Sequence, residues 1–321
     1  GRRKRLSDPA SLAPALKVIS GDIALGPVLA GAAKVYTITS LAGFEAVLRG
    51  IPTVVTGMPF YAGWGITDDR SACVRRTRKL TPEQVFAAAY LLYTKYFDPA
   101  TGNALTAEDV AERLAEAQRL LPPVPAISAN LILTPPEPEP APALVESVLK
   151  PRLALLNIVS WKREIVKRKF NAYDVVFLGL KNGADGVSRA HEVGRLEAIV
   201  IWGYPDLDWV DDTAKRLGIP IWRIEDGFLR SVGLGANHIA PLSYCIDRTG
   251  LYFDPRFPSD LENTLLTYEF DADPALMERA RKLIEHMISQ GISKYNGMPA
   301  ASVDIARPYV LVLGQCEDDA S

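Results

Sequence analysis

Short apolar runs alternate with amphipathic stretches along the chain, and this rhythm predicts an α/β protein. Near the start, residues 35–39 are mostly β-branched or apolar, which favours a strand. Residues 41–49 then place Leu, Phe and Val on one helical face, and Gly50 stands where that helix should end. Residues 52–56 predict a second strand, so this region contains a βαβ unit.

Two further helices and a spacer follow this unit. The helices are predicted at residues 82–93 and 107–120, each behind a threonine that can cap its first turn. Residues 122–142 then hold eight prolines interleaved with alanine and glutamate. Such a stretch is extended and semi-rigid, and it buries no core. We therefore expect it to separate two globular pieces.

The second piece repeats the α/β rhythm from its beginning. Three short, continuous apolar runs predict buried parallel strands at residues 175–178, 198–202 and 220–224. Right-handed crossovers between them would build a doubly wound sheet. The other elements predicted in this piece are helices at 211–217 and 278–288, a hairpin of 244–247 and 251–253 turned at 248–250, and a strand at 309–313.

Composition narrows the class of protein. With 321 residues, 48% of them hydrophobic, the chain is long enough for two domains with proper cores. A formal net charge of −2 gives no global field that would recruit nucleic acid. The three cysteines form no CxxC pair and the three histidines are scattered, so we expect reduced thiols, no metal site and a cytoplasmic protein. No apolar run in the sequence approaches the ~20 residues needed to cross a bilayer.

The two ends of the sequence indicate that it is part of a longer polypeptide. It starts without a methionine, on a basic cluster, and it stops just after the strand predicted at residues 309–313. A protein does not normally end in the loop that follows a sheet strand, so we expect this sequence to be a fragment.

Paired acids at the end of a predicted strand are the first candidate for chemistry. In "RIEDGFLRSVGLG", residues 223–235, Glu225 and Asp226 follow an apolar run and precede a glycine. Ligands of open α/β sheets bind where strands end. Two carboxylates there suit sugar transfer, because one can carry a proton while the other stays charged. The alternative is structural, since Arg230 can pair with one acid and leave an ion-paired turn.

The acidic ending "GQCEDDAS", residues 314–321, lies in the same topological situation, after another predicted strand. Clustered carboxylates there can hold a cation, but no histidine or regular ligand spacing supports a metal.

The βαβ unit of the first piece offers a second candidate. Ser40 lies between a strand and a helix. Its hydroxyl and the free backbone N–H groups suit a phosphate, and the alternative is that Ser40 is only an N-cap. Glu45, one turn into the helix, can reach a ribose hydroxyl or face solvent. The loop "PFYAGWG", residues 59–65, sets three aromatic residues among glycines directly after a strand. Its rings can hold a base or a sugar, and a packed loop explains them about as well.

Six stretches of the chain together resemble the bacterial capsule polysaccharide β-Kdo transferases of the KpsC type. They span most of the chain outside the proline-rich segment, and six matches in this context are far more specific than a single glycine motif. The stretches are "TSLAGFEAVLRG" (39–50), "PFYAGWGITDDR" (59–70), "IEDGFLRSVGLG" (224–235), "GLYFDPRFPSDLE" (250–262), "SKYN" (293–296) and "GQCEDDAS" (314–321).

The resemblance implies a fold and a layout. Members of this family have two GT-B glycosyltransferase modules in tandem, each with two Rossmann-like halves, and this chain resembles the second half of one module followed by the first half of the next. The family's His-Pro motif, which supplies part of the cytidine-nucleotide contacts, is absent here. The implied divisions are a nucleotide-binding half at residues 1–121, a proline-rich linker at 122–150, an acceptor-side half at 151–300 and a truncated continuation at 301–321.

The resemblance also implies a reaction. The donor is CMP-Kdo, the acceptor is a lipid-linked Kdo, and β-Kdo is transferred with retention through a covalent carboxylate intermediate. No metal, further cofactor or nucleic acid is implied, and the enzyme is expected in the cytoplasm, peripheral to the inner membrane, beside other capsule-assembly proteins. The matching residues are Glu225, Asp226 and the nucleophile Asp319 for catalysis; Thr39, Ser40, Gly43, Glu45, Tyr61, Gly63 and Trp64 for the donor; and Arg230, Ser231, Lys294 and Asn296 for the substrate.

The layout has a consequence for the site. Because Ser40 and Asp226 match different modules, we expect them not to face one cleft, and we expect the chain alone to be inactive. Two alternative functions stay open. One is a GT-B transferase that uses another nucleotide sugar, such as a UDP-hexose. The other is a non-catalytic scaffold of a capsule-assembly complex that keeps these loops only for packing.

Overall fold

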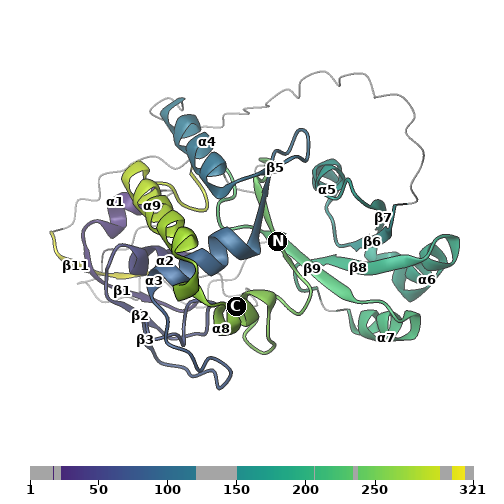
Figure 1. Ribbon diagram of the computed structural model, residues 1–321, viewed down its shortest axis with the longest axis horizontal. Helices are drawn as coiled ribbons and strands as arrows, with labels where there is room; N and C mark the ends of the chain where they lie inside the picture. The colour runs from purple at the N-terminus through teal and green to yellow at the C-terminus, as the bar shows by residue number, and fades with distance from the viewer. Residues whose placement is uncertain are drawn as a thin grey trace.

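The computed structural model describes residues 17, 23–120, 150–205, 207–233, 238–296 and 306–314 of the chain. They form two lobes, each built on one sheet, which we call the small-sheet lobe and the large-sheet lobe (Figure 1). Nearly all of the proline-rich segment and the acidic ending with Asp319 lie outside the described residues, so the predictions for them stay predictions.

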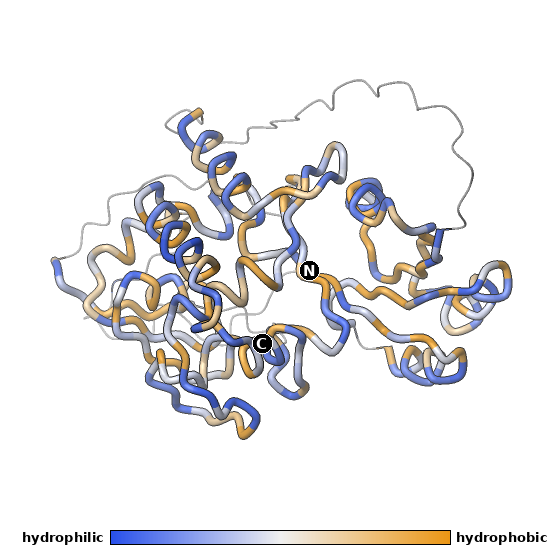
Figure 2. Tube along the Cα trace, in the orientation of Figure 1, coloured by the Kyte–Doolittle hydropathy of each residue, from blue (hydrophilic) through white to orange (hydrophobic). Residues whose placement is uncertain are grey.

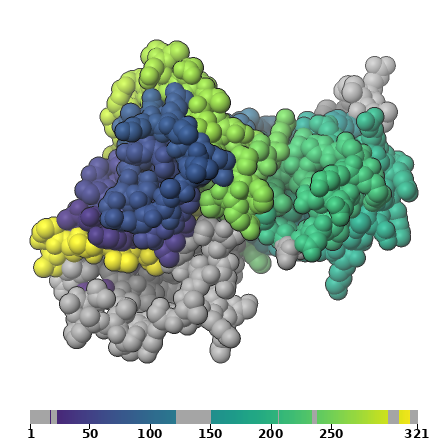
Figure 3. All heavy atoms as spheres, turned by 90° about the horizontal axis from the view of Figure 1, so that it is seen from below, coloured from purple at the N-terminus to yellow at the C-terminus, as the bar shows by residue number. Residues whose placement is uncertain are grey.

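The small-sheet lobe contains the predicted βαβ unit. Its elements are α1 (Leu25–Leu29), β1 (Ala32–Thr37), α2 (Leu41–Leu48), β2 (Thr53–Val55), β3 (Asp68–Asp69) and β11 (Tyr309–Val312). The four strands are parallel and lie in the order β11-β1-β2-β3. The strand β11 comes from the far end of the chain, and Figure 3 shows this segment in yellow against the purple first elements.

The large-sheet lobe has seven strands. They are β4 (Thr94–Phe97), β5 (Ala104–Leu105), β6 (Arg152–Leu156), β7 (Asp174–Leu178), β8 (Leu196–Trp202), β9 (Ile221–Asp226) and β10 (Ser243–Asp247). Their order is β5-β4-β10-β9-β8-β6-β7, with a parallel half from β9 to β7 and an antiparallel half from β10 to β5. In Figure 2 the strands of the parallel half are largely orange, as expected for buried parallel strands.

Helices cover both faces of the parallel half. The helices α6 (Gly183–Val193) and α7 (Asp208–Leu217) pack on one face, and α5 (Arg163–Lys169) packs on the other. This is the doubly wound arrangement that the sequence predicts for the second piece. Short 3₁₀ turns at Ser160–Lys162, Leu180–Asn182 and Phe270–Ala272 complete the connections.

The remaining helices join the two lobes. The helix predicted at residues 82–93 is present as α3 (Pro82–Phe86) followed by a π-helical stretch at Ala87–Tyr93, which runs directly into β4. The others are α4 (Ala107–Leu120), α8 (Asp260–Thr267) and α9 (Pro274–Gln290). The cores of the two lobes are thereby linked by helices that begin in one and end beside the other (Figure 1).

The predicted hairpin at residues 244–253 is wrong. The strand β10 pairs with β9 and β4, and residues 251–253 form no strand. The cause is the buried carboxylate of Asp247, which accepts hydrogen bonds from the backbone N–H groups of Thr249, Gly250 and Asp260 at 2.8–3.1 Å. These bonds turn the chain toward α8 instead of back along β10.

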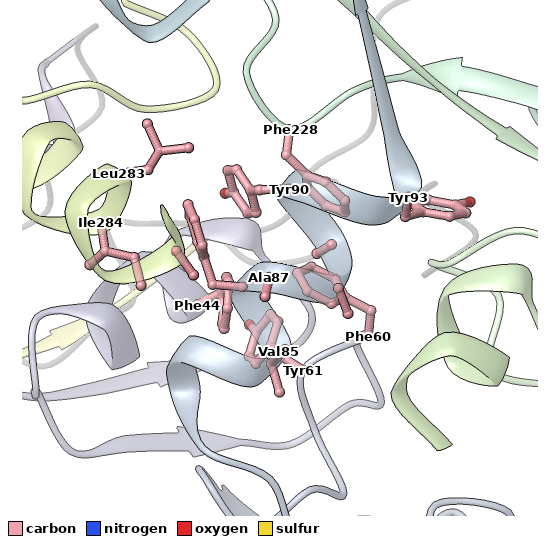
Figure 4. Close-up of a cluster of buried hydrophobic side chains, with 14 of the residues drawn as sticks. Phe44, Phe60, Tyr61, Val85, Ala87, Tyr90, Tyr93, Phe228, Leu283 and Ile284 are labelled. Carbon is pink, nitrogen blue, oxygen red and sulfur yellow. The ribbon is translucent and has the colours of Figure 1, made fainter. Parts of the chain in front are cut away.

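The two pieces of the sequence share one core. The ring of Tyr90, from the first piece, stacks on the ring of Phe228, from the second, at 5.0 Å between centroids. Phe60, also from the first piece, lies 4.9 Å from the Phe228 ring (Figure 4). Each piece also gives a strand to the other: β4 and β5 join the large sheet, while β11 joins the small one. The pieces on either side of the proline-rich segment are therefore not independent bodies.

Candidate functional site

The site lies where the parallel strands of the large sheet end, on the edge that faces the small-sheet lobe (Figure 1). Glu225 and Asp226 are the last two residues of β9. The chain leaves β8 through Gly203, whose φ of 66° favours glycine. It leaves β6 through Asn157, whose side chain donates to the carbonyl of Trp202 at 2.9 Å. Three strand ends thus converge on the paired acids.

Asp226 is held by two cations. Its Oδ2 accepts from Nε of Arg230 at 2.7 Å, and its Oδ1 accepts from Nζ of Lys162 at 3.1 Å. The Arg230 side chain is fully buried and that of Lys162 nearly so. The ion pair with Arg230 that the sequence left open as a structural alternative is present, and both oxygens of Asp226 are occupied.

Glu225 has different surroundings from its neighbour. Its Oε1 accepts from the backbone N–H of Asp226 at 2.9 Å, and its Oε2 lies beside the backbone of Gly203, where an added Cβ would be 3.5 Å away. Burial and the negative charge of Asp226 raise the pKa of Glu225, while the Asp226 N–H, Lys294 and Lys162 lower it by less. A carboxyl with a raised pKa, and with one oxygen to which no described residue is shown to hydrogen-bond, can carry a proton.

Arg230 has a spare donor. Beside its bond to Asp226, it donates from one terminal nitrogen to Oγ of Ser231 at 2.7 Å. The other terminal nitrogen is buried and has no hydrogen-bond partner among the described residues. A buried guanidinium N–H without a partner is costly, and an anionic group of a ligand is the natural acceptor for it.

The "SKYN" stretch closes the site from the side of α9. Lys294 accepts the backbone N–H groups of Arg230 and Ser231 at its carbonyl, at 3.2 and 3.4 Å. Burial acts to lower the pKa of the Lys294 ammonium, but Tyr252, Tyr295 and both acids outweigh it and raise the pKa. This lysine therefore stays charged beside Glu225.

Asn296 is a structural link in this region. Its Nδ2 donates to the carbonyl of Ser231 at 3.1 Å, and its Oδ1 accepts from Gln118 of α4 at 3.1 Å. The side chain is almost fully buried. It fixes the loop after β9 to a helix of the first piece, so its contacts within the chain account for its position.

Ser40 caps α2. Its Oγ accepts from the backbone N–H of Ala42 at 3.3 Å, and its carbonyl accepts from the Tyr61 hydroxyl at 2.5 Å. Gly43 packs beneath Tyr61, where a Cβ would overlap that hydroxyl, and Thr39 is half-buried against Gly57. The cap that the sequence allowed is present, and Ser40 and Thr39 keep partly exposed surface at the start of the helix.

The aromatic loop after β2 is packed inside the protein. Tyr61 and Trp64 have no exposed surface, and Trp64 donates from Nε1 to the carbonyl of Phe60 at 2.7 Å. Gly63, with φ of 85°, donates its N–H to Asp69 at 2.8 Å. Of the two interpretations that the sequence allowed, the structure shows the packed loop, and neither ring has a free face for a base or sugar in this conformation.

Glu45 connects the first piece to the acids of the second. It is 3% exposed, and its Oε2 lies 3.6 Å from Arg49 without a hydrogen bond. The backbone of Lys294 acts to lower the pKa of the Glu45 carboxyl, and the Lys294 charge acts to lower the pKa of Glu225. Lys294 is therefore near acids of both pieces. The expectation that Ser40 and Asp226 do not face one cleft stays a prediction.

Glu45 should make the stability of the protein depend on pH. Burial raises its pKa from 4.5 to about 7, against smaller lowering effects of Arg49 and the Lys294 backbone. The unfolded chain then ionises first, so the free energy of unfolding falls as pH rises from 4.5 to 7, by roughly 3 kcal/mol in total. We expect Glu45→Gln to match the parent near pH 4.5 and to be more stable above pH 7, as measured by urea unfolding across this range.

The matched control for this experiment is Glu116→Gln, at an exposed position of α4. It should follow the parent at every pH, because an exposed carboxyl has similar surroundings in the folded and unfolded chain. Parallel curves for Glu45→Gln and the parent would show that Glu45 titrates normally.

Two further observations concern metal ligands and membrane-spanning helices. Within the described ranges, no three His, Cys, Asp or Glu side chains come together in a way that could hold a metal ion. None of the helices in that part of the chain is both long and apolar enough to span a bilayer.

Comparison with known proteins gives the site a context. The family model for capsule polysaccharide biosynthesis proteins matches residues 10–98 and 197–313. The chain is 34% identical over 322 residues to the capsule polysaccharide modification protein LipA of Neisseria meningitidis serogroup B, which covers 95% of this chain and 40% of LipA. It is 38% identical over 176 residues to the lipopolysaccharide-processing protein LpsZ of Rhizobium meliloti, which covers 54% of this chain and 40% of LpsZ.

Among solved structures, the β-Kdo 2,4 transferase KpsC of Thermosulfurimonas dismutans is 32% identical, with a TM-score of 0.35, over 46% of this chain and 42% of that one. The chain thus spans about 40% of the length of the curated relatives that it matches.

Proposed function

This chain belongs to the capsule polysaccharide biosynthesis protein family, and from this premise we propose that it forms part of a glycosyltransferase that transfers β-Kdo from CMP-Kdo to a lipid-linked Kdo acceptor. The observation that carries the proposal is the unequal pair of acids at the end of β9. Both oxygens of Asp226 are held by cations, whereas Glu225 has a raised pKa and accepts, from the described residues, only at Oε1. Such a pair separates a proton carrier from a fixed charge.

The donor carries negative charge, and the site offers positive groups to receive it. The unpartnered terminal nitrogen of Arg230 and the ammonium of Lys294 suit the Kdo carboxylate. The start of α2, where Thr39 and Ser40 keep partly exposed surface, suits the phosphate of CMP. Glu45 is then the candidate for the ribose, although its burial requires the ligand to reach into the interface.

The proposed reaction has two displacements. In the first, the carboxylate of Asp319 attacks the anomeric carbon of Kdo, and the bond to the phosphate oxygen breaks with its electron pair, so that CMP leaves. In the second, the acceptor hydroxyl attacks the same carbon and the bond to Asp319 breaks, which regenerates the carboxylate. The hydroxyl proton passes to Glu225, because its raised pKa makes it a better proton acceptor than an ordinary carboxylate.

A donor comparison in the intact protein tests this proposal. We expect transfer from CMP-Kdo to a synthetic lipid-linked Kdo acceptor, and no transfer from a UDP-hexose. Intact-protein mass spectrometry should find a Kdo adduct after incubation with CMP-Kdo alone, and Asp319→Asn should abolish it because the nucleophile is gone.

Each other outcome points to a different function. Transfer from the UDP-hexose would identify a transferase with another nucleotide sugar. Absence of transfer with every donor, together with normal folding, would identify a scaffold of the capsule-assembly machinery. The chain alone should be tested in parallel, since its two pieces share one core and the expectation that it is inactive remains a prediction.

A further inference from the structure

Lys162 occupies a position that the stability of the fold does not require. After β6 the chain turns through Asn157, which has a φ of 60°, and a 3₁₀ turn delivers Lys162 to the start of α5. The side chain is pointed inward and is 7% exposed. A cation at the N-terminal end of a helix opposes the helix dipole, and burial lowers the pKa of this lysine against the attraction of Asp226.

The shortest contacts printed for the Lys162 ammonium lie inside the site. Its Nζ is 3.1 Å from Oδ1 of Asp226 and 3.6 Å from the centre of the Trp202 ring, at the end of β8. The other oxygen of Asp226 is bonded to Arg230, which is fully buried. One buried guanidinium already balances one carboxylate, so the second cation adds a desolvation cost without being needed for neutrality.

Two hydrogen-bond donors, one on each oxygen, fix the orientation of the Asp226 carboxylate. A carboxylate bonded through a single oxygen can still rotate about its terminal bond, which has a broad torsional minimum. A second anchor on the other oxygen fixes its plane. Glu225 lies next to this clamp, with its Oε1 bonded to the Asp226 backbone N–H and its Oε2 beside Gly203, and the Lys162 charge acts on it as well.

We propose that Lys162 is a positioning residue for the transfer reaction: with Arg230 it clamps both oxygens of Asp226, excludes that acid from proton transfer and leaves Glu225 as the proton acceptor. This inference rests on the function proposed above. The charged and titratable groups that act on the acid pair are Lys162, Arg230, Lys294, Tyr244, Tyr252 and Cys245.

The test is Lys162→Met in the intact protein. We expect kcat to fall about 10- to 100-fold, as for a misplaced catalytic group, while KM for CMP-Kdo changes less than about threefold. Lys162 lowers the pKa of Glu225, so its removal should move the acidic limb of the kcat/KM profile to higher pH. Lys162→Arg should restore most of the rate and return the limb toward its original position.

Lys169→Met is the matched control. Lys169 is the last residue of α5, the helix that begins directly after Lys162. It is partly buried, its Nζ lies 5.4 Å from the centre of the Phe97 ring, and it has no carboxylate partner among the described residues. It should leave both rate and pH profile unchanged. An unshifted profile in Lys162→Met, or an equal loss in Lys169→Met, would overturn the positioning role.

A double-mutant cycle of Lys162→Met and Asp226→Asn separates this inference from the proposed function. Measured on kcat, the two changes should cost far less together than the product of their separate costs, because both release the same clamp. Measured on unfolding, the cycle needs no activity. If the wild-type protein transferred no sugar, the proposed function would fail, while coupling in the unfolding cycle would still support the clamp and its absence would overturn it.

Discussion

Replacing Glu225 with glutamine should lower kcat for sugar transfer by about 10²- to 10⁴-fold, the usual contribution of a general acid–base group. Glutamine has the same shape, and its side-chain oxygen can still accept from the Asp226 N–H. What it lacks is the ability to take a proton at the position beside Gly203. The donor KM should change little, because the positive groups that suit the donor are untouched.

Two comparisons decide whether this loss is specific. Glu197→Gln, at an exposed position of the neighbouring strand β8, should leave activity unchanged. Thermal unfolding of Glu225→Gln should match or exceed that of the parent above neutral pH, since the removed group has a raised pKa and is therefore unfavourable in its charged form. Activity within threefold of the parent would transfer the proton role to another group.

The sequence predicted the parallel half of the large sheet well, for a physical reason. Buried parallel strands are continuous apolar runs, and β7, β8 and β9 all begin and end within a few residues of their predicted bounds. The strand β6 was not predicted, because its core run, Leu153–Leu156, has leucine and alanine but no β-branched or aromatic residue, and periodicity alone does not separate such a run from a helix. The hairpin failed because Asp247 binds backbone groups as far along the chain as Asp260, a contact no local pattern reveals.

The candidate site was also predicted only in part from the sequence. The position of Glu225 and Asp226 at the carboxyl edge of a sheet was predicted, and the structure confirms it. The sequence did not predict that Asp226 is the acid held by two cations, because one of these is Lys162, which follows the unpredicted strand β6 and is distant from both acids in sequence. The signal that could have found it is a lysine flanked by Trp161 directly after an apolar run.

The pairing of Glu262 explains how the aromatic loop of one lobe is fixed to the other. Glu262 is 4% exposed and accepts from Nε of Arg76 at 3.0 Å and from Nε of Arg75 at 2.6 Å. Arg76 in turn donates to the carbonyls of Pro59 and Ala62, at 2.5 and 2.7 Å, within the loop that follows β2. Burial would raise the pKa of Glu262, but its hydrogen bonds to the two arginines outweigh this and lower it.

Glu262→Gln should therefore lower the free energy of unfolding by about 3–5 kcal/mol, because it leaves the buried Arg76 without its counter-charge. The control is Glu108→Gln, which breaks a pair of the same kind between the same pieces, with Arg279 at 2.9 Å, but at a half-exposed position. Exposed pairs contribute about 0–1 kcal/mol, so this variant should unfold close to the parent in urea.

The lowered pKa of Glu262 predicts how the loss depends on pH. It gives stability that is present above the ordinary glutamate pKa and is lost as pH falls below it. The difference in unfolding free energy between parent and Glu262→Gln should therefore narrow in acid. Equal losses in the two glutamine variants would mean that burial does not distinguish the pairs, and a gap that stays constant in acid would assign the loss to packing instead of charge.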